Sequence, residues 1–118
     1  TVVCAWLPQK YHEAFPGVLN GGIIGSILDC HSNWAAAFYL MKSQNLKTTP
    51  CTVTADYSIK LKKPTPSDRL LTLSAELVSI KNNVAKINAH LLVDDVLFAS
   101  CLGTFVAVDS SHPAYHRW

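Results

Sequence analysis

One carboxylate, Asp29, lies in the middle of an apolar stretch that begins at Asn20-Gly21-Gly22. An ionised carboxylate is costly to remove from water unless it is paired or hydrogen-bonded. A protein that buries one usually shifts its pKa, and such groups concentrate at sites of chemistry. Asp29 is therefore the first candidate for a catalytic group.

The residues around Asp29 have the spacing of an α-helix from about Gly21 to Met41. Apolar residues recur at intervals of three and four and are expected in the core: Ile23, Ile24, Ile27, Leu28, Cys30, Trp34, Ala35, Phe38, Tyr39 and Met41. A second strip at helical spacing is small or polar and could admit a partner's backbone or a ligand: Gly22, Gly25, Ser26, Asp29, Ser32, Asn33 and Ala36. His31 is expected to be a core or interface histidine.

The rest of the chain predicts strands that cover this helix. Residues 1–7 are expected to form a short strand, followed by a loop to Gly17. Residues 52–62 alternate between polar and apolar side chains. One predicted face carries Val53, Ala55, Tyr57, Ile59 and Leu61, and the other carries Thr52, Thr54, Asp56, Ser58, Lys60 and Lys62. Tyr57 is expected in the core.

Three more strands are predicted at 69–80, 84–93 and 96–108, and together with 52–62 they are expected to form a four-strand antiparallel meander. The dipeptides between them, Asn82-Asn83 and Asp94-Asp95, tolerate the positive φ of a two-residue hairpin turn. The simplest cover for so apolar a helix is a sheet that curls around it. We therefore predict an α+β fold in which a curved antiparallel sheet wraps around one long central helix.

Composition limits the class of protein. The 118 residues predict a single domain over 1–118, with 109–118 as a tail. Hydrophobic residues make up 49% of the chain and charged residues only 15%, which favours an oligomer because little of the surface can be charged. A net charge of +2, without a basic run interleaved with aromatics, argues against nucleic acid.

The cysteines and the longest apolar stretch indicate the compartment. Cys4, Cys30, Cys51 and Cys101 are widely spaced, with no C-x-x-C pair and no secretory leader, so we predict reduced thiols, no metal site and a cytoplasmic protein. Asp29, His31 and Asn33 interrupt the longest apolar stretch. These polar residues argue against a membrane span.

Two motifs in this order resemble the PaaI-like family of hotdog-fold acyl-CoA thioesterases, from about Phe15 to Val108. The first is Asn20-Gly21-Gly22 followed by Asp29, where the family has a His-Gly-Gly turn and an acidic residue nine positions after the His. The second is residues 54–66, which are similar to a family strand that opens with Thr-Ala and ends in a basic residue and Pro-x-Pro. The predicted meander that follows these motifs ends in residues 99–105, which also fit the pattern of the family.

The resemblance implies a hotdog fold and hydrolysis of an acyl-CoA, or a related acyl thioester, to a free acid and a thiol. Gly21 matches the position whose backbone N–H binds the developing oxyanion, a role suited to a helix N-terminus and to a residue without Cβ. Asp29 matches the acidic catalyst, which acts either as a general base on water or as a nucleophile. Asn20 stands where many relatives have His, and Thr54 matches a hydroxyl that assists the acid in some relatives.

The spacing of the two principal groups bears on assembly. Gly21 and Asp29 are eight helical residues apart, roughly 12 Å at about 1.5 Å per residue, so one thioester carbon cannot touch both. In the family the oxyanion donor comes from one subunit and the carboxylate from its neighbour across a two-fold axis. We therefore expect a homodimer, or a homotetramer built as a dimer of dimers. Its junction is expected to involve Gly25, Ser26, Ser32, Asn33 and Ala36.

Further residues are candidates for binding substrate. Gly22, Ser26 and Asn33 share the helix strip with Asp29. Lys62 and Lys63 could meet the phosphates of coenzyme A, although a solvated strand edge is the alternative interpretation. Coenzyme A is expected only as part of the substrate, with no other cofactor.

Alternative functions remain open from the sequence. A non-catalytic hotdog module that binds acyl-CoA or another apolar acid is favoured by Asn20 and Ala14, which stand where relatives have a His and an Asn. A dehydratase or hydratase would need a His beside the acid, and His31 lies on a diverging face of the helix. A purely structural subunit is the remaining alternative.

Overall fold

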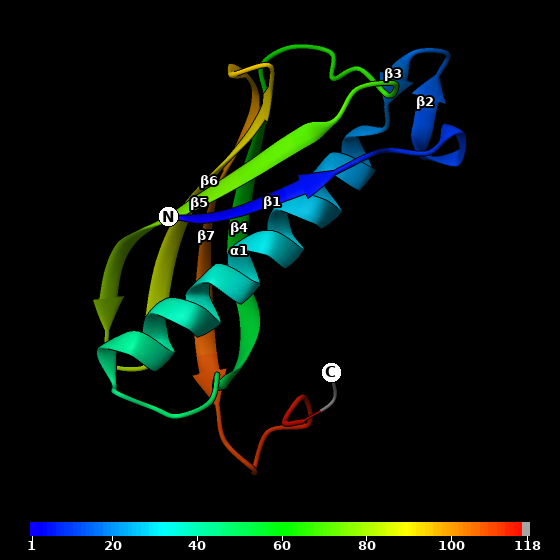
Figure 1. Cartoon of the computed structure of the whole chain (residues 1–118). Coiled ribbons are helices and arrows are strands. Elements are labelled where there is room, and N and C mark those ends of the chain that lie inside the picture. Colours follow the sequence, from blue (N-terminus) through cyan, green and yellow to red (C-terminus); the bar gives the residue numbers. More distant parts are fainter. Residues whose placement is uncertain (117–118) are drawn as a thin grey trace.

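The helix around Asp29 and the strands that cover it are present in the computed structural model, which describes residues 1–116 (Figure 1). The elements in chain order are β1 (Val2–Trp6), the 3₁₀ turn η1 (Lys10–His12), β2 (Glu13–Phe15), β3 (Val18–Leu19), α1 (Gly21–Ser43), β4 (Cys51–Leu61), β5 (Leu71–Lys81), β6 (Val84–Val93) and β7 (Val96–Val108). The predicted tail begins after β7, and its last two residues lie outside the described residues.

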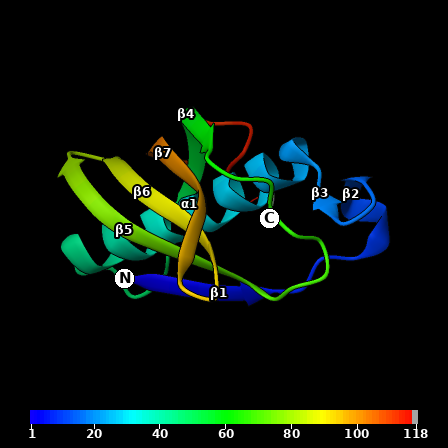
Figure 2. The ribbon, with the colours of Figure 1, turned by 90° about the horizontal axis from the view of Figure 1, so that it is seen from above.

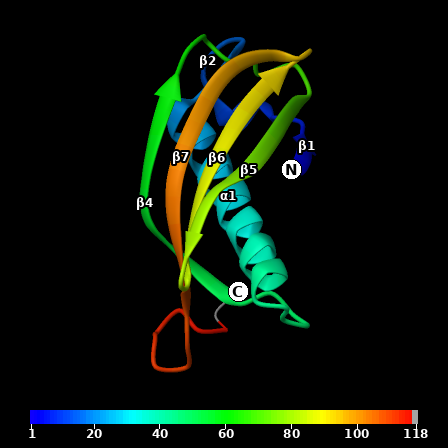
Figure 3. The same ribbon diagram turned by 90° about the vertical axis from the view of Figure 1, so that its left-hand side faces the viewer.

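Five strands form one antiparallel sheet in the order β1-β5-β6-β7-β4. The sheet curves around α1, with β4 at one edge and β1 at the other (Figures 2 and 3). The core between helix and sheet includes the fully buried side chains of Leu28, Leu40, Ile87, Leu91 and Phe105. The predicted α+β architecture is therefore confirmed.

Two-residue turns join the strands of the meander, as predicted. Asn82 and Asn83 connect β5 to β6, and Asn82 has φ of 57°. Asp94 and Asp95 connect β6 to β7 with φ of 49° and 66°, the left-handed pair that matches the twist of a hairpin.

The predicted loop before Gly17 is instead a small structured unit. It contains η1 and the two-stranded β2–β3 sheet, joined through a turn in which Gly17 has φ of 84°. The unit lies beside the first turn of α1 (Figure 1). Short strands of two and three residues carry too little periodic signal to be predicted.

The buried face of α1 differs from the predicted one. Gly25, Ser32 and Ala36, expected at a subunit junction, are buried within the chain itself. Trp34 and Phe38, expected in the core, are 47% and 38% exposed. Apolar residues occur on most sides of the helix, so spacing alone could not tell which side faces the sheet. The exposed stripe of α1 consists of Gly22, Ser26, Cys30, Trp34 and Phe38, each four residues after the last.

The alternation predicted for β4 fails at its middle. The register of β4 against β7 shifts between Thr54 and Asp56, leaving Ala55 as the extra residue of a β-bulge. Before the bulge, Thr52 and Thr54 face the helix, and Thr52 is only 1% exposed. After it, the helix-facing residues are Ile59 and Leu61, which lie against Gly25 and Gly21. Tyr57, expected in the core, is 47% exposed.

The glycine in β7 makes room for the largest fully buried side chain. A Cβ built on Gly103 would lie 2.6 Å from Cε2 of Phe105, whose ring is completely buried. We expect Gly103→Ala to lower the free energy of unfolding in urea by about 1–3 kcal/mol, because the ring must move within a packed core.

Gly25→Ala is the matched control. Its Cβ would meet Ile59 at 3.9 Å, an ordinary contact, and alanine favours the helix by up to about 1 kcal/mol. This variant is expected to unfold at the same urea concentration as the parent or a higher one. Equal stability of Gly103→Ala and the parent would contradict the packing described for Phe105.

Candidate functional site

The carboxylate of Asp29 is held by the strand that lies beside it. Thr54 Oγ1 donates a hydrogen bond of 2.7 Å to Asp29 Oδ1 across the junction of β4 and α1. Both side chains are half-buried, so one side of the pair is covered by the chain and the other is open. The bulge after Thr54 adds one residue to β4. Thr54 therefore faces the helix, and so do Ile59 and Leu61 beyond the bulge.

Asn33 lies one helical turn beyond Asp29 and also contacts β4. Its Nδ2 donates to the carbonyl oxygen of Thr52 at 3.3 Å, and Thr52 Oγ1 donates to the carbonyl oxygen of Asn33 at 3.4 Å. The buried Oδ1 of Asn33 has no partner among residues 1–116. The amide therefore fixes the helix against the strand next to the acid.

The first turn of α1 presents an unused backbone donor. Asn20 is the N-cap, and its Oδ1 accepts a hydrogen bond of 2.7 Å from Gly22 N. Ile24 N donates to Asn20 O at 3.1 Å. Within the part of the chain that the structure describes, the Gly21 N–H has no acceptor. It lies at the positive end of the helix dipole, where an anionic group is stabilised.

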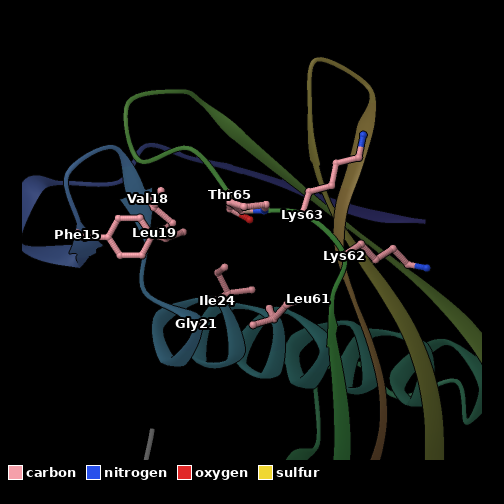
Figure 4. A pocket seen from close by; sticks show the side chains of 10 residues that line it. Phe15, Val18, Leu19, Gly21, Ile24, Leu61, Lys62, Lys63 and Thr65 are labelled. Carbon is pink, nitrogen blue, oxygen red and sulfur yellow. The ribbon is translucent and has the colours of Figure 1, made fainter.

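A cavity of about 330 Å³ opens beside this donor (Figure 4). Apolar side chains from three segments form most of its wall, and the complete lining is Phe15, Val18, Leu19, Gly21, Ile24, Leu61, Lys62, Lys63, Pro64 and Thr65. Asp29 is not among them. Within a single chain, the candidate acid and the candidate oxyanion donor therefore do not share this cavity.

The β2–β3 unit forms one wall of the cavity and is tied to the segment after β4. Leu19 N donates to Thr65 O at 2.9 Å, and Ser67 N donates to Gly17 O at 3.1 Å. The Glu13 carboxylate accepts hydrogen bonds from Gly17 N, at 2.9 Å, and from the Ser67 hydroxyl. The bonds from Ser67 and Gly17 hold the pKa of Glu13 below its usual range.

Solved structures of the thioesterase superfamily share this architecture. A thioesterase superfamily protein from Shewanella loihica PV-4 is 26% identical, with a TM-score of 0.76 over 91% of this chain and 82% of that one. A hypothetical thioesterase protein with coenzyme A from Streptococcus pneumoniae TIGR4 is 17% identical, with a TM-score of 0.76 over 90% and 77%. A phenylacetic acid degradation-related protein from Ralstonia eutropha JMP134 is 19% identical, with a TM-score of 0.74 over 89% and 74%.

The chain has the hotdog fold of the thioesterase superfamily. The resemblance found in the two sequence motifs is thereby confirmed. Neither a family model nor a curated protein matches the sequence.

The other predicted site residues lie at different places on the hotdog domain. Gly22 and Ser26 are exposed on the first two turns of α1, where Ser26 Oγ donates to Gly22 O at 2.9 Å. Lys62 and Lys63 line the rim of the cavity, and Figure 4 shows their side chains extending away from its apolar wall. The structure thus brings Asp29, Thr54 and Asn33 together. Lys62 and Lys63 lie instead at the cavity beside Gly21.

The remaining groups to consider in the hotdog domain are possible metal ligands, the buried Cys101 thiol and His31. Residues 1–116 contain no group of three or more His, Cys, Asp or Glu side chains arranged to hold a metal ion. Burial raises the pKa of the Cys101 thiol, which disfavours a thiolate. His31, as expected, is a core histidine, with Nε2 2.9 Å from Val2 O. None of the described helices is long and apolar enough to cross a bilayer.

Sequence reasoning missed most of the cavity. Phe15 was expected in a loop, Val18 and Leu19 fell between the predicted loop and the predicted helix, and Thr65 was named only as part of the second motif. The sequence does carry one signal for a hairpin here: the common turn dipeptide Pro16-Gly17 lies between apolar residues. A hairpin there, next to a helix start, would have placed these side chains around Gly21.

The Glu13 hydrogen bonds predict a pH-dependent contribution to stability. Because the pKa of Glu13 is lowered in the folded state, its ionised form stabilises the fold. This contribution is present above about pH 4.3, the ordinary glutamate value, and is lost as the pH falls below it. Glu13→Gln keeps an acceptor but removes the charge, so we expect it to reduce the free energy of unfolding more at pH 6 than at pH 3.

Urea unfolding of both proteins at the two pH values measures this difference. The other titrating groups, including Asp109 with its own lowered pKa, contribute equally to both proteins and cancel. A destabilisation that is the same at pH 3 and at pH 6 would show that the Glu13 charge has no part in holding the hairpin.

Proposed function

We propose that this chain hydrolyses an acyl-CoA, or a related acyl thioester, in a site formed between two copies of itself. Asp29 of one subunit acts on water or on the thioester carbon, and the Gly21 N–H of the other subunit binds the oxyanion. The observation that carries the proposal is the Thr54–Asp29 hydrogen bond, because it fixes a carboxylate on a half-open face of a hotdog helix. Coenzyme A bound to the Streptococcus pneumoniae relative supports the substrate class.

An unpaired strand edge and an exposed apolar stripe support the dimer. β4 ends the sheet and pairs only with β7 among the described strands, so its outer edge has free backbone groups. Tyr57 of β4 and Trp34, which lies with Cys51 around a small cavity, are large and exposed near this edge. Antiparallel pairing of β4 with its copy about a two-fold axis would satisfy the edge and cover these side chains. It would also set the two helices antiparallel, bringing each Asp29 toward the other Gly21.

The reaction needs only water and groups of the two subunits. As a general base, Asp29 takes a proton from water while the water oxygen bonds to the thioester carbon. The carbonyl oxygen becomes an oxyanion, which the Gly21 N–H and the helix dipole stabilise. The C–S bond then breaks, and the departing thiolate takes the proton back from Asp29, giving a free acid and a thiol. Nucleophilic attack by Asp29 would instead pass through an anhydride that water cleaves.

Neighbouring residues have supporting parts in this proposal. Thr54 occupies Oδ1 of Asp29 and leaves Oδ2 for water. Asn20 fixes the first turn of α1, so that the Gly21 N–H points to the substrate. Gly22 and Ser26 line the approach along the helix, Asn33 holds α1 against β4 beside the acid, and Lys62 and Lys63 meet the phosphates of coenzyme A at the rim. Two such dimers could pair into a tetramer.

Substitution of the acid and its partner tests the proposal. Asp29→Asn keeps an acceptor for Thr54 but cannot take a proton, so we expect turnover to fall by about 10²–10⁴-fold. Thr54→Val removes the hydroxyl that orients the carboxylate, and a loss of about tenfold is expected. Thiol release from acyl-CoAs of several chain lengths measures both.

Thr104→Val is the matched control, because Thr104 lies in β7 on the face of the sheet away from α1, next to buried Phe105. It is expected to retain the parent rate. Unchanged turnover in Asp29→Asn would refute the role of the acid. Tight acyl-CoA binding by calorimetry without thiol release from the parent would favour the non-catalytic binding module instead.

A further inference from the structure

Two opposite charges on β4 have no charged partner within the chain. Asp56 and Lys60 are both exposed, and the one ion pair among residues 1–116 joins Arg69 to Asp94. Among the described strands β4 pairs only with β7, so its other edge is open (Figure 3). Open strand edges are templates for pairing with another chain. The two charges therefore bear on which chain pairs there and in which register.

The two faces of β4 limit the possible registers. Beyond the bulge, Ile59 and Leu61 face α1. Asp56, Ser58 and Lys60 alternate with them and lie on the outer face of the sheet. Directly opposed residues of an antiparallel pair share a face. When β4 pairs with its own copy, the two-fold axis must therefore pass through a residue and not between two residues.

The charges favour one position of the axis. An axis through Ser58 places Asp56 of each copy opposite Lys60 of the other, which gives two cross-strand pairs of opposite charge. An axis through Asp56 or Lys60 would oppose like charges. An axis through Tyr57 or Ile59 would place Ser58 opposite one of the two charges and would keep Asp56 and Lys60 apart.

The contacts between β4 and α1 favour the same axis independently. Thr54 holds Asp29, and a Cβ built on Gly21 would lie 3.1 Å from Cδ1 of Leu61. Leu61 is three residues from Ser58 and Thr54 is four, but the bulge adds one residue on that side. An axis through Ser58 therefore sets Thr54 of one copy opposite Leu61 of the other. Asp29 of one copy then faces Gly21 of the other.

We infer that a second copy of this chain pairs with β4 in one register, with Ser58 on the two-fold axis and Asp56 opposite Lys60. This inference rests on the proposed function and adds to it the register that builds the shared site. Moving the axis by one residue slides the strands by two residues, about 7 Å. That shift would break the charge pairs and would displace Asp29 from Gly21. Asp56 and Lys60 position the subunits and do not touch the substrate.

Single cysteines on the outer face of β4 measure the register. Ser58→Cys, Asp56→Cys and Lys60→Cys each place a thiol at an exposed position. With the axis at Ser58, the two copies of position 58 lie within reach of a disulfide, whereas the two copies of position 56 or of position 60 lie about 13 Å apart. After mild oxidation, Ser58→Cys alone should form a disulfide-linked dimer. Asp56→Cys should form one only when it is co-expressed with Lys60→Cys.

Non-reducing electrophoresis measures these linked dimers. The parent protein gives the background, because Cys4 and Cys30 are exposed. A linked dimer above this background from Asp56→Cys alone or Lys60→Cys alone would overturn the register. Absence of a linked dimer from Ser58→Cys would overturn it as well.

Charge reversal tests the part of Asp56 and Lys60 in dimer formation. Asp56→Lys and Lys60→Asp each oppose like charges twice, so the dissociation constant of the dimer should rise about tenfold at low salt. The double variant restores opposite charges and should recover the parental value. Lys86→Asp is the matched control, because Lys86 is exposed in β6 and pairs with Thr104 of β7, away from the open edge. Analytical ultracentrifugation measures all four, and a double variant as weak as the single ones would overturn the inference.

Thiol release from acyl-CoAs separates this inference from the proposed function. Cross-linking through Ser58→Cys in a protein that hydrolyses no acyl-CoA would end the proposed function and leave the register supported. Hydrolysis with cross-linking only at another position would keep the proposed function and overturn the register. A parent protein that stays monomeric at micromolar concentration would overturn both.

Discussion

The bulge at Ala55 is the constraint on which the rest of the site depends. A regular strand would send Thr54 and Ile59 to opposite faces, because side chains alternate along it. The extra residue lets both face the helix. Thr54 can therefore hold Asp29, while Ile59 and Leu61 pack against the glycines nearer the start of α1. Polar support for Asp29 and an apolar lining near the Gly21 amide come from one strand.

The rigidity of α1 then separates the two groups that we propose to act on the thioester. A helix cannot fold back on itself, so Gly21 and Asp29 stay roughly 12 Å apart whatever the substrate does. Each lies in a suitable environment at its own position: the amide next to an apolar cavity, and the carboxylate beside a hydroxyl on a half-open face. Two copies related by a two-fold axis would place Asp29 of each copy beside Gly21 of the other, giving two equivalent sites.

Much of this fold could be predicted from local patterns. The helix start, the β5–β6–β7 meander and both two-residue turns follow from apolar spacing and from Asn and Asp pairs that accept positive φ. The prediction that β4 opens the meander beside β5 was wrong, because β4 pairs with β7 at the other side of the sheet. The orientation of α1 could not be predicted, since apolar residues occur on most of its sides and only packing decides which side is buried. Trp34 and Phe38 were therefore placed in the core, although they are exposed.

The candidate site was predictable only in part. The motif spacing singled out Asp29, Gly21 and Thr54, but strict alternation placed Thr54 on the face opposite Tyr57 and left its reach to Asp29 open, because a bulge leaves no signal in the hydrophobic pattern. The cavity wall comes from segments distant in sequence, the β2–β3 hairpin and the Pro64–Pro66 turn. Their meeting depends on backbone hydrogen bonds such as Leu19 N to Thr65 O, which side-chain patterns do not encode.

Recovery of activity from two inactive variants tests the shared site most directly. Gly21→Pro removes the N–H at the first helical position, where proline is tolerated, and the extended Asn20, with φ of −65° and ψ of 133°, suits a following proline. Gly21→Ala keeps the N–H but brings a Cβ 3.1 Å from Leu61, so its activity measures how much of any loss comes from the added bulk alone.

Asp29→Asn and Gly21→Pro chains, differently tagged and co-expressed in equal amounts, would form mixed dimers with one intact site each. Random pairing makes half of the dimers mixed and half of their sites intact, so about a quarter of parental thioesterase turnover should return. Mixed dimers isolated through both tags that remain as inactive as either variant alone would contradict a site shared between subunits.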